Sequence, residues 1–137
     1  MALTNVLQFG DNGIGRYAKE YLVVKCHSTF CRSYNHLRPE GKPRCERVEL
    51  TIVAPGKEDL SLYDWYINQD LQDGRIVLDI SPTTAQDVGQ QRVLEFENAQ
   101  CFSLSENYEI NTQYRRLLTL AFEAETVTVD EVEFDHI

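Results

Sequence analysis

The stretch Asp59–Gly74, DLSLYDWYINQDLQDG, decides the fold, because it predicts the one convincing helix of the chain. Ser61 and Asp64 have the spacing of a capping box, in which the hydroxyl accepts a backbone N–H of the first turn and the carboxylate reaches back. Gly74 can adopt the positive φ that ends such a segment before the next strand. The pattern therefore predicts a short α-helix over about residues 60–70, capped at its start by a side chain.

One face of this helix carries its largest apolar side chains. Leu62, Trp65 and Tyr66 recur, together with Gln69, at the i, i+3, i+4, i+7 spacing of an amphipathic helix. About three turns are too few for a helix to be stable alone in water, so packing must hold it in place. We therefore expect Leu62, Trp65 and Tyr66 to anchor the helix, with Trp65 covering a sheet or closing the end of a barrel.

Strand-like sequence lies on both sides of the helix. Val48, Leu50 and Ile52, for example, alternate with polar residues, which is typical of a strand with one buried face. About seven or eight mostly antiparallel strands with one flanking helix predict a mainly β fold, a compact β-barrel or a tightly rolled sandwich, in one domain over residues 1–137. The last of the predicted strands either continues its predecessor or stands alone. In the strand before it, the residues predicted to point inward are Leu118, Leu120, Phe122 and Ala124. The predicted strands are 3–9, 20–32, 45–54, 74–81, 92–97, 100–105, 114–125 and 126–134.

Two connections between these segments are predicted to be irregular. Asn98–Ala99 reads as the turn between the strands at 92–97 and 100–105. Ser33–Arg44, SYNHLRPEGKPR, has no hydrophobic period and contains two prolines and a glycine, which predicts a long exposed loop. Loops of about twelve residues without secondary structure are usually functional or flexible. A basic loop on an acidic protein is therefore the best candidate for a contact with another molecule.

The charge balance excludes some classes of partner. The net charge is −9, from 22 acidic and 13 basic residues, whereas a nucleic-acid binder needs a basic face for phosphates. No run approaches the roughly 20 apolar residues of a membrane-spanning helix, so we expect no membrane insertion. The first residues contain neither a basic region nor an apolar run of a secretory signal, which predicts folding in the cytoplasm. The four cysteines are then expected to be reduced thiols.

The cysteines and histidines do not predict a metal site. Cys26 and Cys31 lie five residues apart on one predicted strand, so their side chains point to opposite faces and do not converge on one metal ion. Cys26 shares its side of the strand with Leu22, Val24 and Phe30, which favours a small core hydrophobe over a ligand.

Catalytic motifs are missing as well. The chain contains no P-loop, dinucleotide fingerprint, EF-hand loop or nucleophile motif. Its three histidines therefore have no nucleophile motif beside them for which they could act as a general base. Cys31 or Cys45, near the basic loop, is a candidate for an exposed thiol, but nothing marks either as a nucleophile. We therefore expect no cofactor, no metal and no enzymatic activity.

The order of several segments carries further information. YLVVKCHSTFCR (Tyr21–Arg32) precedes a loop with Arg38 and Pro39, a strand, LYDWYINQ (Leu62–Gln69) and GRIV (Gly74–Val77). LEFENA and LTLAF follow, at residues 94–99 and 118–122. In order and spacing, over about residues 20–125, these segments resemble the tube protein of the type VI secretion system. That family is the haemolysin-coregulated protein (Hcp, TssD), and the resemblance is best to its Bacteroidetes branch.

This resemblance implies a β-barrel subunit that assembles into six-membered rings, which stack into a tube. In that family a contractile sheath propels the tube out of the cell, sometimes with effectors in the lumen. The implied partners are other copies of the chain and the sheath, spike and effector proteins, and the protein would leave the cytoplasm without a signal peptide. By the same resemblance, residues 33–44 correspond to an extended loop that contacts the adjacent ring. The implied ring-stacking residues are Arg38, Pro39, Gly41, Lys42 and Arg44, of which the three basic ones are expected to meet acidic groups.

A different class of function stays open beside this one. A monomeric small barrel could bind an apolar ligand, with Trp65 closing its mouth. The bulky aliphatic and aromatic residues inferred for the interior favour a filled core over such a pocket. A phage tail-tube subunit is a third reading, and it shares the assembly physics of the first.

Overall fold

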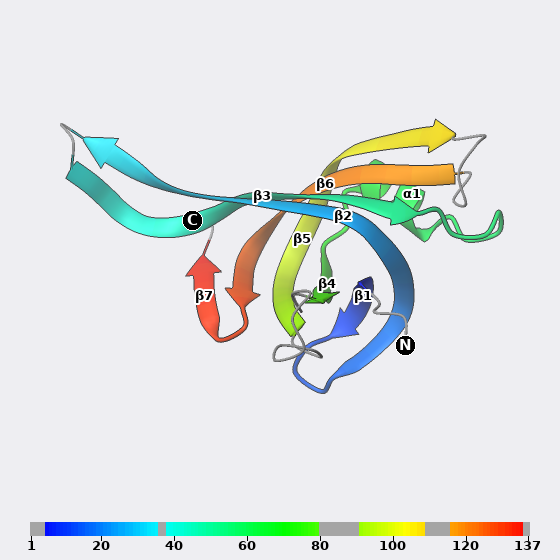
Figure 1. The fold of residues 1–137 in the computed structure, drawn as a ribbon, viewed down its shortest axis with the longest axis horizontal. Helices are drawn as coiled ribbons and strands as arrows, with labels where there is room; N and C mark the ends of the chain where they lie inside the picture. Colours follow the sequence, from blue (N-terminus) through cyan, green and yellow to red (C-terminus); the bar gives the residue numbers. More distant parts are fainter. Residues whose placement is uncertain (1–4, 36–37, 80–90, 109–115, 136–137) are drawn as a thin grey trace, which may run out of the picture.

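The computed structural model describes residues 5–35, 38–79, 91–108 and 116–135, and within these ranges it leaves the side chains of 31–35, 38–44 and 46 undescribed. Its strands follow the order β3-β2-β1-β4-β5-β6-β7 in one antiparallel sheet, and a further pairing of β3 with β6 closes six of them into a barrel (Figure 1). This confirms the predicted mainly β barrel with one short helix. The elements are β1 (Val6–Asp11), β2 (Arg16–Asn35), β3 (Arg38–Val53), α1 (Ser61–Asn68), β4 (Gln72–Asp79), β5 (Gln91–Tyr108), β6 (Arg116–Val129) and β7 (Val132–Asp135).

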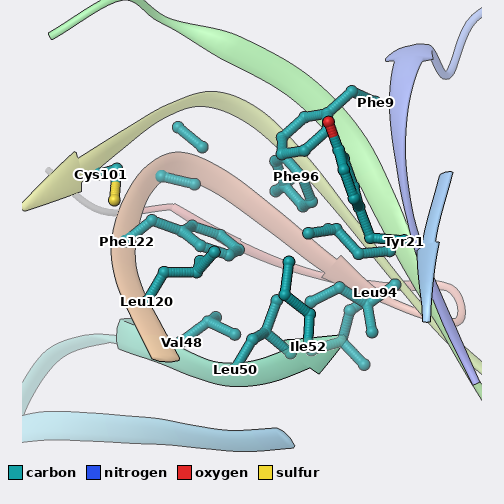
Figure 2. Packing of buried hydrophobic residues seen from close by; sticks show 14 of the residues in the cluster. Phe9, Tyr21, Val48, Leu50, Ile52, Leu94, Phe96, Cys101, Leu120 and Phe122 are labelled. Atoms are coloured by element: carbon teal, nitrogen blue, oxygen red, sulfur yellow. The ribbon is translucent and has the colours of Figure 1, made fainter. Parts of the chain in front are cut away.

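Alternating side chains of the barrel strands fill its interior (Figure 2). The rings of Phe9, Phe96 and Phe122 meet in sequence, with centroids 6.0 Å apart in the first pair and 4.8 Å in the second. This packed interior favours a filled core over a ligand-binding pocket. The residues predicted to point inward from β3 and β6 are all buried: Val48, Leu50, Ile52, Leu118, Leu120, Phe122 and Ala124.

The helix is shorter than predicted, and different residues begin and end it. Leu60 is its N-cap residue and makes no side-chain cap, so the predicted capping box is wrong. Gln69 ends the helix in the left-handed conformation, with φ of 55°. Gly74 instead lies within β4, where a Cβ atom would come 2.2 Å from the carbonyl oxygen of Gln8. Its role is therefore to let β1 and β4 approach closely.

On β2 the predicted apolar side is not the buried side. Leu22 and Val24 are 45% and 49% exposed, whereas Tyr21 and Val23 are buried. The reason is a β-bulge: Val23 pairs with Ile52 and Lys25 with Thr51, which leaves Val24 as an extra residue. The bulge exchanges the two faces, so that Cys26, beyond it, packs against the core as predicted.

The turn predicted at Asn98–Ala99 is wrong, because β5 runs through it as one strand. Asn98 has φ of 54°, and the pairing of β5 with β4 shifts at this point. Its backbone N–H donates to Asp73 Oδ1 at 2.8 Å, and its side-chain amide donates to Glu125 Oε2 at 2.7 Å. Asparagine tolerates the left-handed conformation, so the strand bends here without ending.

The loop predicted for Ser33–Arg44 is also wrong. Most of it belongs to β2 and β3, which continue beyond the barrel as a two-stranded arm (Figure 1). The backbones of Cys31 and Arg44 are paired, and pairing extends to Asn35 and Arg38 at the far end. Residues 36–37, between them, lie outside the described part of the chain. We use "the arm" below for residues 31–35 and 38–44.

Candidate functional site

The indole of Trp65 fixes helix α1 to the barrel. Its Nε1–H donates to the carbonyl oxygen of Ala99 on β5 at 3.0 Å, and the residue is 2% exposed. Its ring meets Phe9 edge-on with centroids 5.2 Å apart, and Phe122 at 5.6 Å. Leu62, one turn earlier, is buried with it. The helix therefore covers the barrel with the two side chains of its buried face.

Tyr66, the third predicted anchor, does not join this core. It is 41% exposed, and its neighbour Ile67 is 72% exposed. The buried stripe of the helix is thus narrower than the i, i+3, i+4 pattern predicts. Tyr66 and Ile67 instead line an open groove beside β5, described below.

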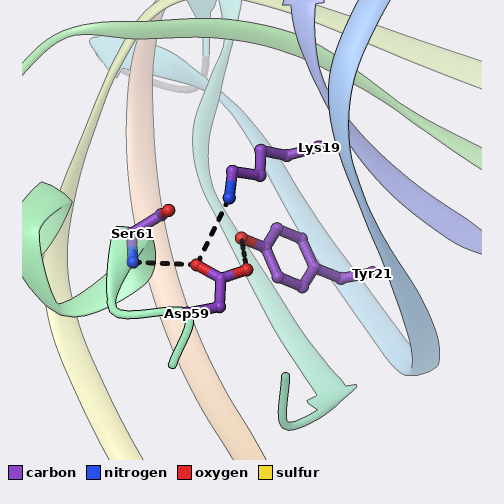
Figure 3. A network of polar contacts seen from close by, with 4 residues as sticks. All are labelled: Lys19, Tyr21, Asp59 and Ser61. Carbon is purple, nitrogen blue, oxygen red and sulfur yellow. Dashed lines mark hydrogen bonds and ion pairs between the residues drawn. The ribbon is translucent and has the colours of Figure 1, made fainter. Parts of the chain in front are cut away.

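A small polar network holds the start of the helix (Figure 3). The carboxylate of Asp59 accepts a hydrogen bond from the backbone N–H of Ser61 at 3.0 Å and one from the Tyr21 hydroxyl at 3.1 Å. Lys19 Nζ lies 3.6 Å from the same carboxylate. Burial by itself raises the pKa of Asp59, but the hydrogen bonds and the lysine charge outweigh it and lower the pKa below its usual value. Asp59 therefore replaces the predicted capping box.

Burial, the charge of Asp59 and the hydrogen bond to it together raise the pKa of Tyr21 to about 12. The tyrosine consequently stays neutral and keeps its proton as a donor over the whole neutral range. This network joins β2 to the start of the helix through the Tyr21–Asp59 hydrogen bond.

The predicted ring-stacking residues lie in one element. Arg38, Pro39, Gly41, Lys42 and Arg44 all belong to the first seven residues of β3, in the arm. The backbone of the arm therefore brings them together, as a strand and not as a loop. What their side chains contact lies outside the described part of the structure, so their role stays a prediction.

The base of the arm is supported from the barrel. Phe30, on β2, packs against Phe134 of the last strand β7, with ring centroids 4.7 Å apart. Their neighbours Val129 and Val132 line the same open pocket. Phe30 was expected to share a face with Leu22 and Val24, but the bulge at Val24 exchanges the faces of β2 and so separates them. Strand β7 thus packs against β2 at the point where the arm leaves the barrel.

The outer face of the barrel wall formed by β3 and β6 is polar. Thr51 and Thr119 pair across the two strands, with their hydroxyl oxygens 3.2 Å apart. On β3, Arg47 and Glu49 form an ion pair at 2.6 Å. This face is suited to contact with water, because these side chains are polar or charged.

Within the described ranges, no three histidine, cysteine or acidic residues come together as a metal site. Cys45, a predicted exposed thiol, is buried, and its Sγ–H donates to the carbonyl oxygen of Arg47. Burial raises the pKa of the Cys26 and Cys101 thiols, which makes them poor nucleophiles. Cys31 lies in the arm, where side chains are not described. The described helix α1 is neither long nor apolar enough to span a membrane.

Sequence reasoning missed the exposed apolar residues at the two bulges, Val24 and Phe102. A signal was present for the first: Tyr21–Val24 is an unbroken run of four apolar residues, which puts two apolar side chains on each face of a strand, so one pair must lie outside. For Phe102, no comparable signal exists, because it continues an alternation that a bulge interrupts.

The comparisons with known proteins agree on one family. The family model for TssD, the hemolysin coregulated protein Hcp, matches residues 1–137. Among solved structures, Hcp1 from Flavobacterium johnsoniae superposes with a TM-score of 0.72 at 19% identity, covering 98% of this chain and 100% of that one. Hcp1 from Salmonella typhimurium gives 0.61 at 11% identity, with 96% and 92% covered.

A more distant likeness is to a chain in the six-fold symmetrised baseplate of the anti-feeding prophage. Its TM-score is 0.54 at 10% identity, with 96% of this chain and 95% of that chain covered. No curated protein sequence matches the chain. At such low identities these structures show a shared fold, and the family follows from the full-length match of the family model. The chain therefore belongs to the TssD family, the hemolysin coregulated proteins, and is a tube subunit of a type VI secretion system.

Proposed function

We propose that this chain forms six-membered rings, that the rings stack into the inner tube of the secretion system, and that the arm of one ring contacts the next. The tube would be assembled in the cytoplasm and expelled by a contractile sheath, together with the spike, with effectors carried in its lumen. The family match and the six-fold baseplate that contains a chain of similar fold support this assembly.

The observation that carries the proposal is a pair of strand edges on one barrel wall that have no strand partner in the described part of the chain. The wall consists of β2, β3, β6 and β5, in that order. Beyond Val23, the outer edge of β2 pairs with no other described strand, and beyond Ala99 the same is true of the outer edge of β5. Strand edges that lack a strand partner favour head-to-tail association of copies through added strand pairing. Such a contact repeats from subunit to subunit and forms a ring when the rotation between neighbours closes.

The polar outer face of this wall fits a water-filled lumen. In a ring joined through the β2 and β5 edges, the outer faces of β3 and β6 would lie side by side around one opening. Thr51, Thr119, Arg47 and Glu49 would then line it. The arm leaves this wall lengthwise (Figure 1), which would carry it past the rim of its own ring.

The test is the native mass of the purified chain, measured by sedimentation or light scattering, together with negative-stain images of the same sample. We expect a species of six subunits that appears as rings with a central hole, and stacks of rings at higher concentration. A protein that stays monomeric with and without sheath and spike partners would contradict the proposal. A ring of a different size would contradict the six-fold part alone.

A further inference from the structure

The two outermost strands of the β2–β3–β6–β5 wall each carry a β-bulge that pushes an apolar side chain outward. Val24 is the extra residue on β2, between the pairs Val23–Ile52 and Lys25–Thr51, and it is 49% exposed. Phe102 is the extra residue on β5, between the partners of Phe122 and Ala121, and it is 44% exposed. Bulges at sheet edges commonly re-aim a side chain. Here both re-aimed side chains are apolar and lie at opposite edges of one wall.

The bulge on β5 forms one side of a groove. Helix α1 forms the other side, and the space between them is about 500 Å³ and open to solvent. The Sγ–H of Cys101 donates to the carbonyl oxygen of Ser103 at 3.3 Å, across the bulge, and so keeps its shape. The helix is held at a fixed distance from β5, because the Trp65 indole donates a hydrogen bond to the carbonyl oxygen of Ala99. The groove is lined chiefly by Tyr66, Ile67, Gln69, Gln100, Phe102 and Glu123.

The bulge on β2 forms a projecting patch whose apolar and charged residues complement those of the groove. Leu22 and Val24 are both exposed, and the bulge places Lys25 beside Val24 on the outside, because two consecutive residues oppose one residue of β3. An apolar ridge that ends in a positive charge is thus present at one edge. The groove at the other edge offers Ile67 and Phe102 with the negative charge of Glu123.

We propose that the groove between α1 and β5 receives the Leu22–Val24 ridge of a second copy of this chain, with Lys25 of one copy facing Glu123 of the other. This contact rests on the proposed ring function and names the side chains that join neighbouring subunits. A single patch that bound itself would give a closed pair of subunits, whereas two different patches at opposite edges give the repeating contact that a ring needs. The opposite charges set the register of the two edges.

Two single variants test the contact, one on each patch. Val24→Asp places a charge on the ridge, and Ile67→Asp places one in the groove; both positions are exposed, so the fold is expected to persist. Ile14→Asp, in the turn between β1 and β2 and 67% exposed, is the matched control. We expect the control to form wild-type rings and each of the two variants to sediment as a monomer with an unchanged circular dichroism spectrum.

Mixing the two variants tests whether the patches meet each other. The Ile67→Asp chain keeps an intact ridge and the Val24→Asp chain an intact groove, so the mixture can form one intact contact and no more. We expect equimolar mixtures to form heterodimers at high concentration, while each variant alone stays monomeric. Variants that still form rings, or a variant that dimerises with itself, would overturn the contact. Wild-type chains that form no ring would overturn the ring proposal itself.

The charge pair gives an independent readout. Lys25→Glu and Glu123→Lys should each weaken the ring, so that it dissociates at a higher protein concentration than the wild type does. The double variant should recover stability in large part, because it restores opposite charges in reversed order. Equal losses that simply add in the double variant would show that Lys25 and Glu123 do not face each other.

Discussion

Trp65 Nε1 lies 3.0 Å from the carbonyl oxygen of Ala99, and this hydrogen bond joins the helix to β5 one residue after the Asn98 bend. The indole satisfies a carbonyl group at the place where the pairing of β5 with β4 stops. One side chain thus holds α1 beside β5 and sets the width of the groove between them.

Removal of the indole should therefore be costly. Trp65→Ala is expected to lower the free energy of unfolding by ~3–5 kcal/mol, because it leaves a large cavity among buried aromatic rings. Urea denaturation, followed at a protein concentration low enough to keep the chain monomeric, measures the change. Tyr66→Ala, on the exposed side of the same helix, should change it by no more than about 0.5 kcal/mol. Equal losses of unfolding free energy for the two variants would show that Trp65 is not the residue that anchors the helix.

The glycine of β4 provides a second prediction. In Gly74→Ala, the new methyl group would lie 2.2 Å from the carbonyl oxygen of Gln8 and 2.9 Å from the ring of Phe96, so β1 and β4 must separate. We expect a loss of about 1–3 kcal/mol of unfolding free energy, as for other overpacked sites. Gly56→Ala is the control, since nothing lies within 4 Å of the added atom there. A neutral Gly74→Ala would show that the two strands have room to move apart.

Stability should fall at alkaline pH through Tyr21. Its pKa is about 12 in the folded chain and near 10.0 in the unfolded one, so between these values the unfolded state loses a proton that the folded state keeps. The contribution is complete below pH 10 and is lost as the pH rises toward 12. Tyr21→Phe cannot lose that proton, so the stability difference from wild type should shrink over this window. Thermal unfolding of both proteins at matched pH values measures it; parallel curves would contradict the prediction.

The sequence was informative wherever one strand face stayed buried without interruption. Val48, Leu50 and Ile52 on β3 were predicted correctly, because strict alternation reports a buried face directly. The same rule failed on β2, where the bulge at Val24 exchanges the faces. A bulge depends on pairing with β3, far along the chain, and alternation in one strand cannot reveal it. The helix was found, but its limits depend on Asp59 and Gln69 and not on the Ser61–Asp64 pattern.

The arm was missed for a related reason. Its prolines and glycine are loop signals in an isolated sequence, yet Pro39 lies in β3 opposite Tyr34. Proline is tolerated in a strand whose outer edge has no partner. Before Val48, β3 pairs with β2 and with no other described strand. The composition therefore reports an edge strand as readily as a loop, and only the pairing with β2 distinguishes the two.

The place of the three basic residues on the arm gives the last prediction, which concerns ring stacking. Arg38, Lys42 and Arg44 lie on the arm, before β3 begins to pair with β6 at Val48 and away from the Leu22–Val24 ridge and the groove proposed to join subunits within a ring. Reversing all three to glutamate should leave the ring of six intact and reduce the length of stacked tubes, because the acidic neighbours would then be repelled. Sedimentation reports ring size, and negative-stain images report tube length. Lys57→Glu, exposed in the connection before α1, controls for the lost positive charge. Tubes of wild-type length in the triple variant would show that these cations do not hold neighbouring rings together, whereas broken rings would place the arm in the contact between subunits of one ring.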